Sequence, residues 1–146
     1  MDFEVRAARL KDAEAIAVLT RELGYPCDSR TVRKRLRRIL GRDDQRVFIA
    51  ELSGGRICGW LQTHCSDSLE SGFRVEIIGL IVSGDVRRRG VGRGLVAQAE
   101  EWASNISAEA VIVRSNTARV ESHAFYPSLG YLRAKTQAVY RKLPKT

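Results

Sequence analysis

The chain has 146 residues, of which 44% are hydrophobic and 29% charged, a composition typical of one globular domain with its own core. We therefore expect a single domain over residues 1–146. No run approaches the ~20 apolar residues of a membrane span, and the N-terminus lacks a signal-peptide pattern, so we expect a cytoplasmic protein with no membrane partner. The net charge of +8 favours an anionic partner without choosing among a cofactor, an acidic protein surface and nucleic acid.

Cysteine usage points away from disulfides and metal sites. Cys27, Cys58 and Cys65 are odd in number and show no C-x-x-C spacing, so we interpret them as free thiols. His64 beside Cys65 supplies only two ligands, which is too few for zinc. We expect no metal.

The N-terminal region predicts a strand and two helices. Apolar residues alternate over 3–8, as in a strand, and recur at helical spacing over 11–23. Ser29 is the expected N-cap of a second helix over 30–40. Apolar residues form a stripe on one side of that helix, and a row of cations lies on the opposite side: Arg33, Lys34, Arg35, Arg37 and Arg38. Such a row indicates either a surface for nucleic acid or membrane or a solvated face. Since no aromatic residue interleaves with the charges, we favour the solvated face.

The remaining chain predicts a mixed sheet. Strand patterns cover 46–52, 56–65, 73–82 and 109–115, with a polar loop over 66–72, helices over 90–104 and 117–129, and two closing strands over 131–133 and 136–143. The unit formed by 73–82, 90–104 and 109–115 is a β-α-β crossover, which requires its two strands to be parallel. We predict an α/β chain with a mostly antiparallel central sheet and one parallel pair.

An arginine- and glycine-rich turn joins the buried strand 73–82 to the helix that follows it. The three glycines Gly90, Gly92 and Gly94 would each cost a helix about 1 kcal/mol relative to alanine, which makes sense where a ligand approaches the backbone. The four arginines are Arg87, Arg88, Arg89 and Arg93. A helix N-terminus with free N–H groups and added positive charge predicts a site for a polyanionic cofactor.

Several loop types compete for this turn. No Walker string is present, and a dinucleotide fingerprint at Gly92, Gly94 and Ala97 lacks the acidic residue about twenty positions on. An ordinary glycine turn stays open. Arg87, Gly90 and Gly92 meet the pattern R/Q-x-x-G-x-G/A, and here the chain resembles the GNAT superfamily of N-acetyltransferases, whose loop of this type holds the pyrophosphate of acetyl-CoA.

A second stretch carries the same resemblance. Residues 116–131, from Asn116 through Phe125 and Tyr126 to Gly130, look like the family segment N-x-x-A/R…F-Y-x-x-L-G-[FY]. The resemblance spans nearly the whole chain and implies the GNAT acyl-CoA N-acyltransferase fold, in which the strands 73–82 and 109–115 splay around pantetheine. Pro127 departs from a regular helix, so we expect a kink, or a helix end near Phe125–Tyr126 with a tighter last turn.

The resemblance implies direct transfer of an acetyl group from acetyl-CoA to a primary amine of a small molecule or protein, in a ternary complex. Tyr126 would protonate the departing thiolate, although it could simply pack against cofactor or core. Glu76 would take the proton of the amine, directly or through water, unless it is a solvent-facing strand residue. Glu51, His64 and His123 are reserves. The residues expected to bind the cofactor are Leu80, Ile81, Val82, Arg87, Arg88, Arg89, Gly90, Val91, Gly92, Arg93, Gly94 and Asn116.

Two other functions stay open, namely a basic nucleic-acid-binding module and a CoA-binding sensor of the same fold without catalysis. The acceptor is not encoded in a motif. Asp67, Glu70 and Glu76 would suit a cationic amine, whereas the arginines of the helix over 30–40 would suit an anionic acceptor. A homodimer is neither predicted nor excluded.

Overall fold

The computed structural model describes residues 2–115 and 120–145, and within the second range the side chains from Ala124 onward. The chain divides into two compact units, one ending at Arg114 and the other beginning at Ser115. Each unit is described by itself. That all 146 residues form one domain stays a prediction.

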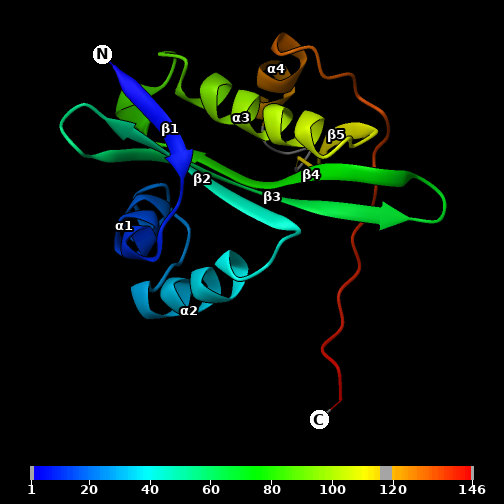
Figure 1. Cartoon of the computed structure of the whole chain (residues 1–146), viewed down its shortest axis with the longest axis horizontal. Helices are drawn as coiled ribbons and strands as arrows, with labels where there is room; N and C mark the ends of the chain where they lie inside the picture. The colour runs from blue at the N-terminus through cyan, green and yellow to red at the C-terminus, as the bar shows by residue number, and fades with distance from the viewer. Residues whose placement is uncertain (1, 116–119, 146) are drawn as a thin grey trace. The chain divides into compact units, whose positions relative to one another are not determined.

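The first unit is built on a sheet with the strand order β1-β2-β3-β4-β5 (Figure 1). The strands are β1 (Phe3–Ala7), β2 (Gln45–Leu52), β3 (Ile57–Ser68), β4 (Gly72–Val82) and β5 (Ala110–Val113). The first three pairs are antiparallel, and β4 and β5 are parallel. This confirms the predicted mixed sheet and its single crossover.

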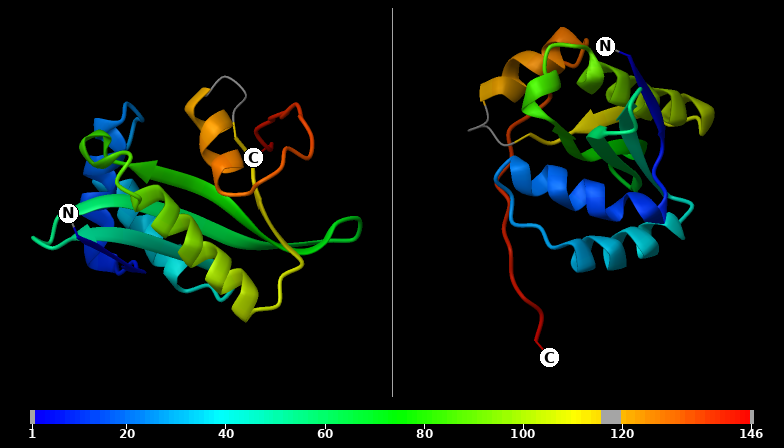
Figure 2. Two further views of the ribbon diagram at one scale, coloured as in Figure 1. Left: turned by 90° about the horizontal axis from the view of Figure 1, so that it is seen from above. Right: turned by 90° about the vertical axis from the view of Figure 1, so that its left-hand side faces the viewer.

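Helices cover both faces of this sheet. The helices α1 (Ala13–Glu22), after the short η1 (Leu10–Asp12), and α2 (Ser29–Leu40) lie on one face, and α3 (Val91–Asn105) lies on the other (Figures 1 and 2). The predicted cap of α2 is wrong, because Asp28 and not Ser29 is the N-cap. The Asp28 carboxylate accepts hydrogen bonds from the N–H groups of Arg30 and Thr31, which leaves Ser29 as the first helical residue.

Glycines of the sheet and of α3 set how closely that helix approaches. A Cβ on Gly59 of β3 would lie 3.1 Å from Leu95 Cδ1 and 3.2 Å from Val91 Cγ1, so the first turns of α3 rest directly on the sheet. Val91 and Leu95 are fully buried there. The N-terminus of α3 is therefore fixed beside the end of β4.

Gly94 tests this packing. A Cβ at this position would lie 2.9 Å from Phe3 Cε2 on β1, closer than carbon atoms approach in proteins. Although alanine is the better helix former by about 1 kcal/mol, we expect Gly94→Ala to lower the free energy of unfolding in urea by about 1–2 kcal/mol through overpacking. The matched control is Gly84→Ala, whose Cβ meets no atom within 4 Å and which should change stability by less than about 0.5 kcal/mol. Equal or greater stability of Gly94→Ala would contradict this packing.

The hairpin between β3 and β4 is longer than predicted. The expected polar loop over 66–72 is wrong at both ends, since β3 continues to Ser68 and β4 begins at Gly72. A short turn suffices because Ser68 Oγ accepts from Ser71 N at 2.9 Å and Gly72 adopts a φ of 80°. A strand that is exposed on one face can contain many polar residues. The polar residues at these strand ends therefore resembled a loop in the sequence.

In the second unit, α4 (Val120–Ser128) runs through Pro127, so the expected helix end near Phe125–Tyr126 is wrong. The tighter last turn is confirmed, because Leu129 N donates to Tyr126 O and Gly130 N to Pro127 O, both at 3.0 Å. Gly130, with a φ of 92°, terminates the helix as expected.

The two predicted closing strands are also wrong. Residues 131–145 form no regular secondary structure, and Leu132, Val139 and Tyr140 are each about 90% exposed. A strand needs a partner for its backbone N–H and C=O groups, and no described strand pairs with this segment. Its β-forming residues are insufficient without such a partner.

Candidate active site

Strands β4 and β5 separate at their carboxyl ends. They pair only over Arg74–Ile77 and Ala110–Val113, and Ile78 is an extra residue in the register of β4 against β3. Beyond Ile77, no described strand pairs with the β5-side edge of β4. This is the splay that the resemblance implied, and it leaves a free strand edge leading toward the bend.

The phase of β4 decides which backbone groups face that edge. Ser83 N donates to Cys58 O on β3 at 2.8 Å, and backbone groups of a strand alternate in direction with a period of two. Ile81 therefore directs its N–H and C=O toward β3, whereas Leu80 and Val82 direct theirs toward the open edge. That Ile81 binds the cofactor stays a prediction, and the direction of its backbone groups does not favour it.

A side-chain clamp fixes the segment that leaves β4. Arg56, at the end of the β2–β3 turn, holds both carboxylate oxygens of Asp85 at 2.7 and 2.9 Å and donates to Ser83 Oγ at 2.9 Å. Ser83 Oγ in turn donates to Asp85 at 2.5 Å. Arg56, with help from Ser83, holds the pKa of Asp85 well below its usual range. The short η2 (Gly84–Val86) is anchored in this way, and Val86 is fully buried.

The bend after η2 turns through two residues with positive φ. Arg88 has a φ of 66° and Gly90 one of 84°, whereas Arg87 before them is extended. A positive φ is uncommon for a side chain as large as arginine. Left-handed residues in a turn direct N–H groups into a shared concavity that binds anions.

The amides of the bend and of the first turn of α3 have no acceptor within the described residues. The first hydrogen bond of the helix joins Gly94 N to Gly90 O at 2.9 Å, so the N–H groups of residues 91–93 precede it. None of the amides of residues 87–93 donates to a described oxygen. The exposed arginines of this region are Arg87, Arg88, Arg89 and Arg93. Free donors, the positive end of α3 and these arginines together favour a pyrophosphate.

Gly94 was also expected to bind the cofactor, and this stays a prediction. Its N–H is already used within the helix, and the space beside its Cα is filled by the Phe3 ring. The third glycine of the motif therefore serves the packing of α3 on β1.

Glu76 is not the solvent-facing residue that the sequence left open. It is 8% exposed and lies directly opposite His64 on β3, with Oε1 3.5 Å from His64 Nε2. Arg114, just after β5, forms an ion pair with the other carboxylate oxygen. Burial raises the pKa of Glu76, but the hydrogen bond and charge of Arg114, aided by His64, leave that pKa below its usual value. Glu76 is therefore an anion at neutral pH.

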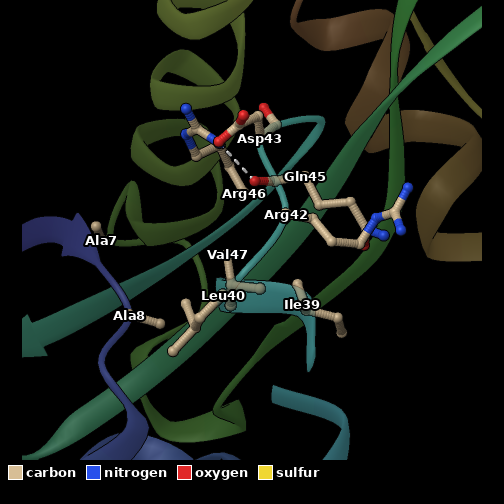
Figure 3. Close-up of a pocket in the computed structure, with 9 residues that line it drawn as sticks. All are labelled: Ala7, Ala8, Ile39, Leu40, Arg42, Asp43, Gln45, Arg46 and Val47. Carbon is tan, nitrogen blue, oxygen red and sulfur yellow. Dashed lines mark hydrogen bonds between the residues drawn. The ribbon is translucent and has the colours of Figure 1, made fainter. Parts of the chain in front are cut away.

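Polar side chains extend from Glu76 across the α1–α2 face of the sheet. Gln62 donates to Gln45 at 3.0 Å, and Gln45 lies opposite His64. Gln45 also lines a pocket of about 250 Å³ at the start of β2 (Figure 3). The end of α2 closes this pocket through Ile39 and Leu40. The helix whose arginines would suit an anionic acceptor thus contributes Ile39 and Leu40 to a pocket next to this polar row.

The remaining predicted residues belong to the second unit. Tyr126 is half-buried on α4, with its ring centroid 4.9 Å from that of Phe125 and 5.9 Å from that of Tyr131, both edge to face. These contacts fix the ring within its own unit. Asn116 lies outside the described residues, and so does the side chain of His123.

Sequence reasoning missed the groups that surround the site. Neither Arg114 nor the Arg56–Asp85 clamp was predicted from the sequence as part of the site. Arg114 lies two residues after Ile112, the residue that pairs with Glu76, and therefore on the same face of the sheet. This signal can be used only when the register of β4 and β5 is known.

A comparison with known protein families assigns this chain to a family. The model of the acetyltransferase (GNAT) family matches residues 12–131. The chain belongs to the GNAT acetyltransferase family. It is therefore an acetyl-CoA-dependent acetyltransferase with an amine acceptor. No curated protein matches the sequence significantly.

Solved structures share the GNAT fold at low sequence identity. Aminoglycoside 6′-N-acetyltransferase AAC(6′)-Ih from Acinetobacter baumannii is 18% identical with a TM-score of 0.86, over 99% of this chain and 100% of that one. AAC(6′)-Iy, in complex with the bisubstrate analog CoA-S-monomethyl-acetylneamine, is 20% identical with a TM-score of 0.86, over 98% and 99%. A transcriptional regulator from Bacillus halodurans C-125 is 20% identical with a TM-score of 0.85, over 97% and 100%. Within the described residues, this GNAT protein has no helix long and apolar enough to cross a membrane.

Proposed function

We propose that this GNAT protein transfers the acetyl group of acetyl-CoA directly to a primary amine, with both substrates bound at once. The observation that carries the proposal is the row of unpaired amides at the start of α3, beside the open edge of β4. The bend binds the pyrophosphate, and Arg88 and Arg93 meet the ribose phosphate. The C=O of Leu80 and the backbone groups of Val82 pair with the pantetheine amides as an added strand would.

The thioester carbonyl needs a donor for the negative charge that develops on its oxygen. The N–H of Leu80 faces the open edge and is the candidate, and such a donor contributes about 3 kcal/mol to transition-state stabilisation. Ile81 is not a candidate, because its N–H is directed toward β3.

Glu76 removes the proton of the acceptor. An alkyl ammonium cannot attack, so it must lose a proton before its nitrogen forms a bond to the carbonyl carbon. Glu76 is buried, anionic and close to where β4 and β5 part. Because Arg114 lowers its pKa, Glu76 is a weak base, and the proton reaches it directly or through water.

Collapse of the tetrahedral intermediate breaks the carbon–sulfur bond and releases the thiolate of CoA. Tyr126 donates its phenolic proton to this sulfur. The ordinary pKa values of a thiol, about 8.5, and of a tyrosine, about 10, differ little enough for the transfer. The nitrogen of the intermediate carries a second proton, which leaves as the amide forms and restores the phenol of Tyr126. The products are the N-acetylated amine, CoA and the proton taken by Glu76.

The pH dependence of the rate tests the role of Glu76. The reactive form is the carboxylate, and a lowered pKa keeps it ionised, so activity should persist as the pH falls until it passes below about 4.5. In Arg114→Gln the effect of burial is opposed only by His64, so the pKa of Glu76 rises and the acidic limb of kcat should move to higher pH. The control Glu14→Gln, at an exposed position of α1, should leave the profile unchanged. An unmoved limb in Arg114→Gln would remove Glu76 from the proton path.

A screen of amines with acetyl-CoA, in which the release of free thiol is measured, would identify the acceptor. Aminoglycosides belong in the panel because two of the similar structures are named AAC(6′) enzymes, one of them an aminoglycoside 6′-N-acetyltransferase. Polyamines, amino acids and peptides with a free N-terminus or lysine complete it. Thiol release that depends on one acceptor class supports the proposal. Tight binding of acetyl-CoA with no transfer to any amine would instead indicate a CoA sensor.

A further inference from the structure

Helix α2 carries most of the excess charge of this protein. Its exposed cations are Arg30, Arg33, Lys34, Arg35, Arg37 and Arg38. The chain has 25 basic and 17 acidic residues, so removing these six leaves 19 against 17 and a net charge of only +2. The six positive charges of this one helix thus equal most of the net charge of +8.

These cations have no acidic counterparts among the described residues. The range 29–40 contains no Asp or Glu, and no ion pair within 4.0 Å includes an α2 side chain. The nearest acid in sequence, Asp28, is used as the N-cap. A merely solvated face would be expected to mix charges of both signs, as helix surfaces with i,i+4 pairs do.

The arrangement also destabilises the helix that carries it. Arg30 and Lys34, Arg33 and Arg37, and Lys34 and Arg38 are like charges one turn apart, which repel each other. Arg30 stands in the first turn, where the helix dipole disfavours a cation. No contact within the described fold compensates this repulsion. We therefore infer that α2 binds a partner that is not part of this chain.

The position of α2 leaves the cations accessible. Leu36 is 4% exposed, and Val32 and Ile39 pack against the same cluster on the α1–α2 face of the sheet. The cations occupy the remaining arc, which spans about 200° at 100° per residue. Figure 2 shows α2, in cyan, on the outer side of this face.

We propose that α2 docks on duplex DNA, through its phosphates. Five of the six cations are arginines, which bind phosphate oxygens with two parallel hydrogen bonds. An α-helix fits the major groove of B-form DNA, about 12 Å wide, so side chains on both flanks of the arc reach phosphates of opposite strands. The deep and narrow major groove of A-form RNA does not admit a helix. No apolar or aromatic side chain interrupts the cationic arc, which disfavours stacking on single strands and insertion into a membrane.

The test measures binding of the purified full chain to a fluorescent 24-base-pair DNA of mixed sequence at several salt concentrations. With up to six phosphate contacts, the slope of log K against log salt should reach about −5. In Arg33→Gln/Arg37→Gln/Arg38→Gln the slope should become less negative by about three. The affinity at 50 mM salt should fall by at least about tenfold. Helix content by circular dichroism should be unchanged, and the melting temperature should not fall, because repulsion is removed.

Matched controls separate this surface from the net charge. Lys135→Gln/Arg141→Gln/Lys142→Gln removes the same charge from exposed positions outside α2 and should leave the DNA slope unchanged. Equal loss in both triple variants, or no DNA binding at 50 mM salt, would overturn the proposal. Binding to a duplex RNA or to polyglutamate as tight as to the DNA would also overturn it, since either would assign α2 to another partner.

Discussion

Replacing Gly92 with glutamate should abolish binding of acetyl-CoA, with a loss of affinity of at least about a hundredfold in calorimetry. Gly92 lies in the first turn of α3, where the amides of residues 91–93 have no acceptor among the described residues. A carboxylate there competes for the same donors as the pyrophosphate and repels it.

The fold should survive this change, because a negative side chain in the first turn of a helix is favoured by the helix dipole. Gly54→Glu is the matched control. It adds the same side chain in the β2–β3 turn, where a Cβ meets no atom within 4 Å. The control should bind acetyl-CoA as the parent protein does. If Gly92→Glu keeps its affinity while its melting temperature is unchanged, the pyrophosphate does not bind at this bend.

Tyr126→Phe should lower kcat by about a hundredfold and leave the affinity for acetyl-CoA unchanged, because the phenolic proton for the thiolate is lost. The ring contacts of Tyr126 with Phe125 and Tyr131 involve its carbon atoms, which phenylalanine retains. The defect should shrink above pH 8.5, where a free thiolate is stable without a proton.

Tyr140→Phe is the matched control, since Tyr140 is 92% exposed and carries no role in this mechanism. It should turn over at the parent rate. A Tyr126→Phe enzyme with the parent kcat at pH 7 would show that another group protonates CoA.

The bend could be predicted from sequence because its signals are local. Glycines at 90 and 92, arginines around them and the apolar strand before them all lie within one short stretch, and backbone conformation there depends on those residues themselves. The mixed sheet could also be predicted, because apolar and polar residues alternate in its strands and because the β-α-β crossover requires one parallel pair.

The surroundings of Glu76 could not be predicted, because they depend on register. His64 faces Glu76 only once the β3–β4 turn is placed at Leu69–Ser71, and the loop predicted over 66–72 hid both strand ends. Arg114 reaches the carboxylate through the parallel pairing of β4 with β5. The extra residue Ile78 likewise sets the phase that separates Leu80 from Ile81, and a sequence pattern does not reveal a bulge.

Patterns also predicted structure that is absent. Val139 and Tyr140 favour strands, yet the segment that contains them has no partner among the described strands. Strand propensity expresses packing against neighbours more than an intrinsic preference of the backbone, so it fails where neighbours are missing.

The central claim is that the amides at the bend bind the diphosphate of acetyl-CoA. Titration of acetyl-CoA into ¹⁵N-labelled protein, followed by two-dimensional NMR, observes these N–H groups individually. The amide signals of Arg88 to Gly92 should show the largest shifts, larger than those of Arg33 to Arg38 on α2. Saturable binding of acetyl-CoA that leaves the bend signals in place would contradict the account.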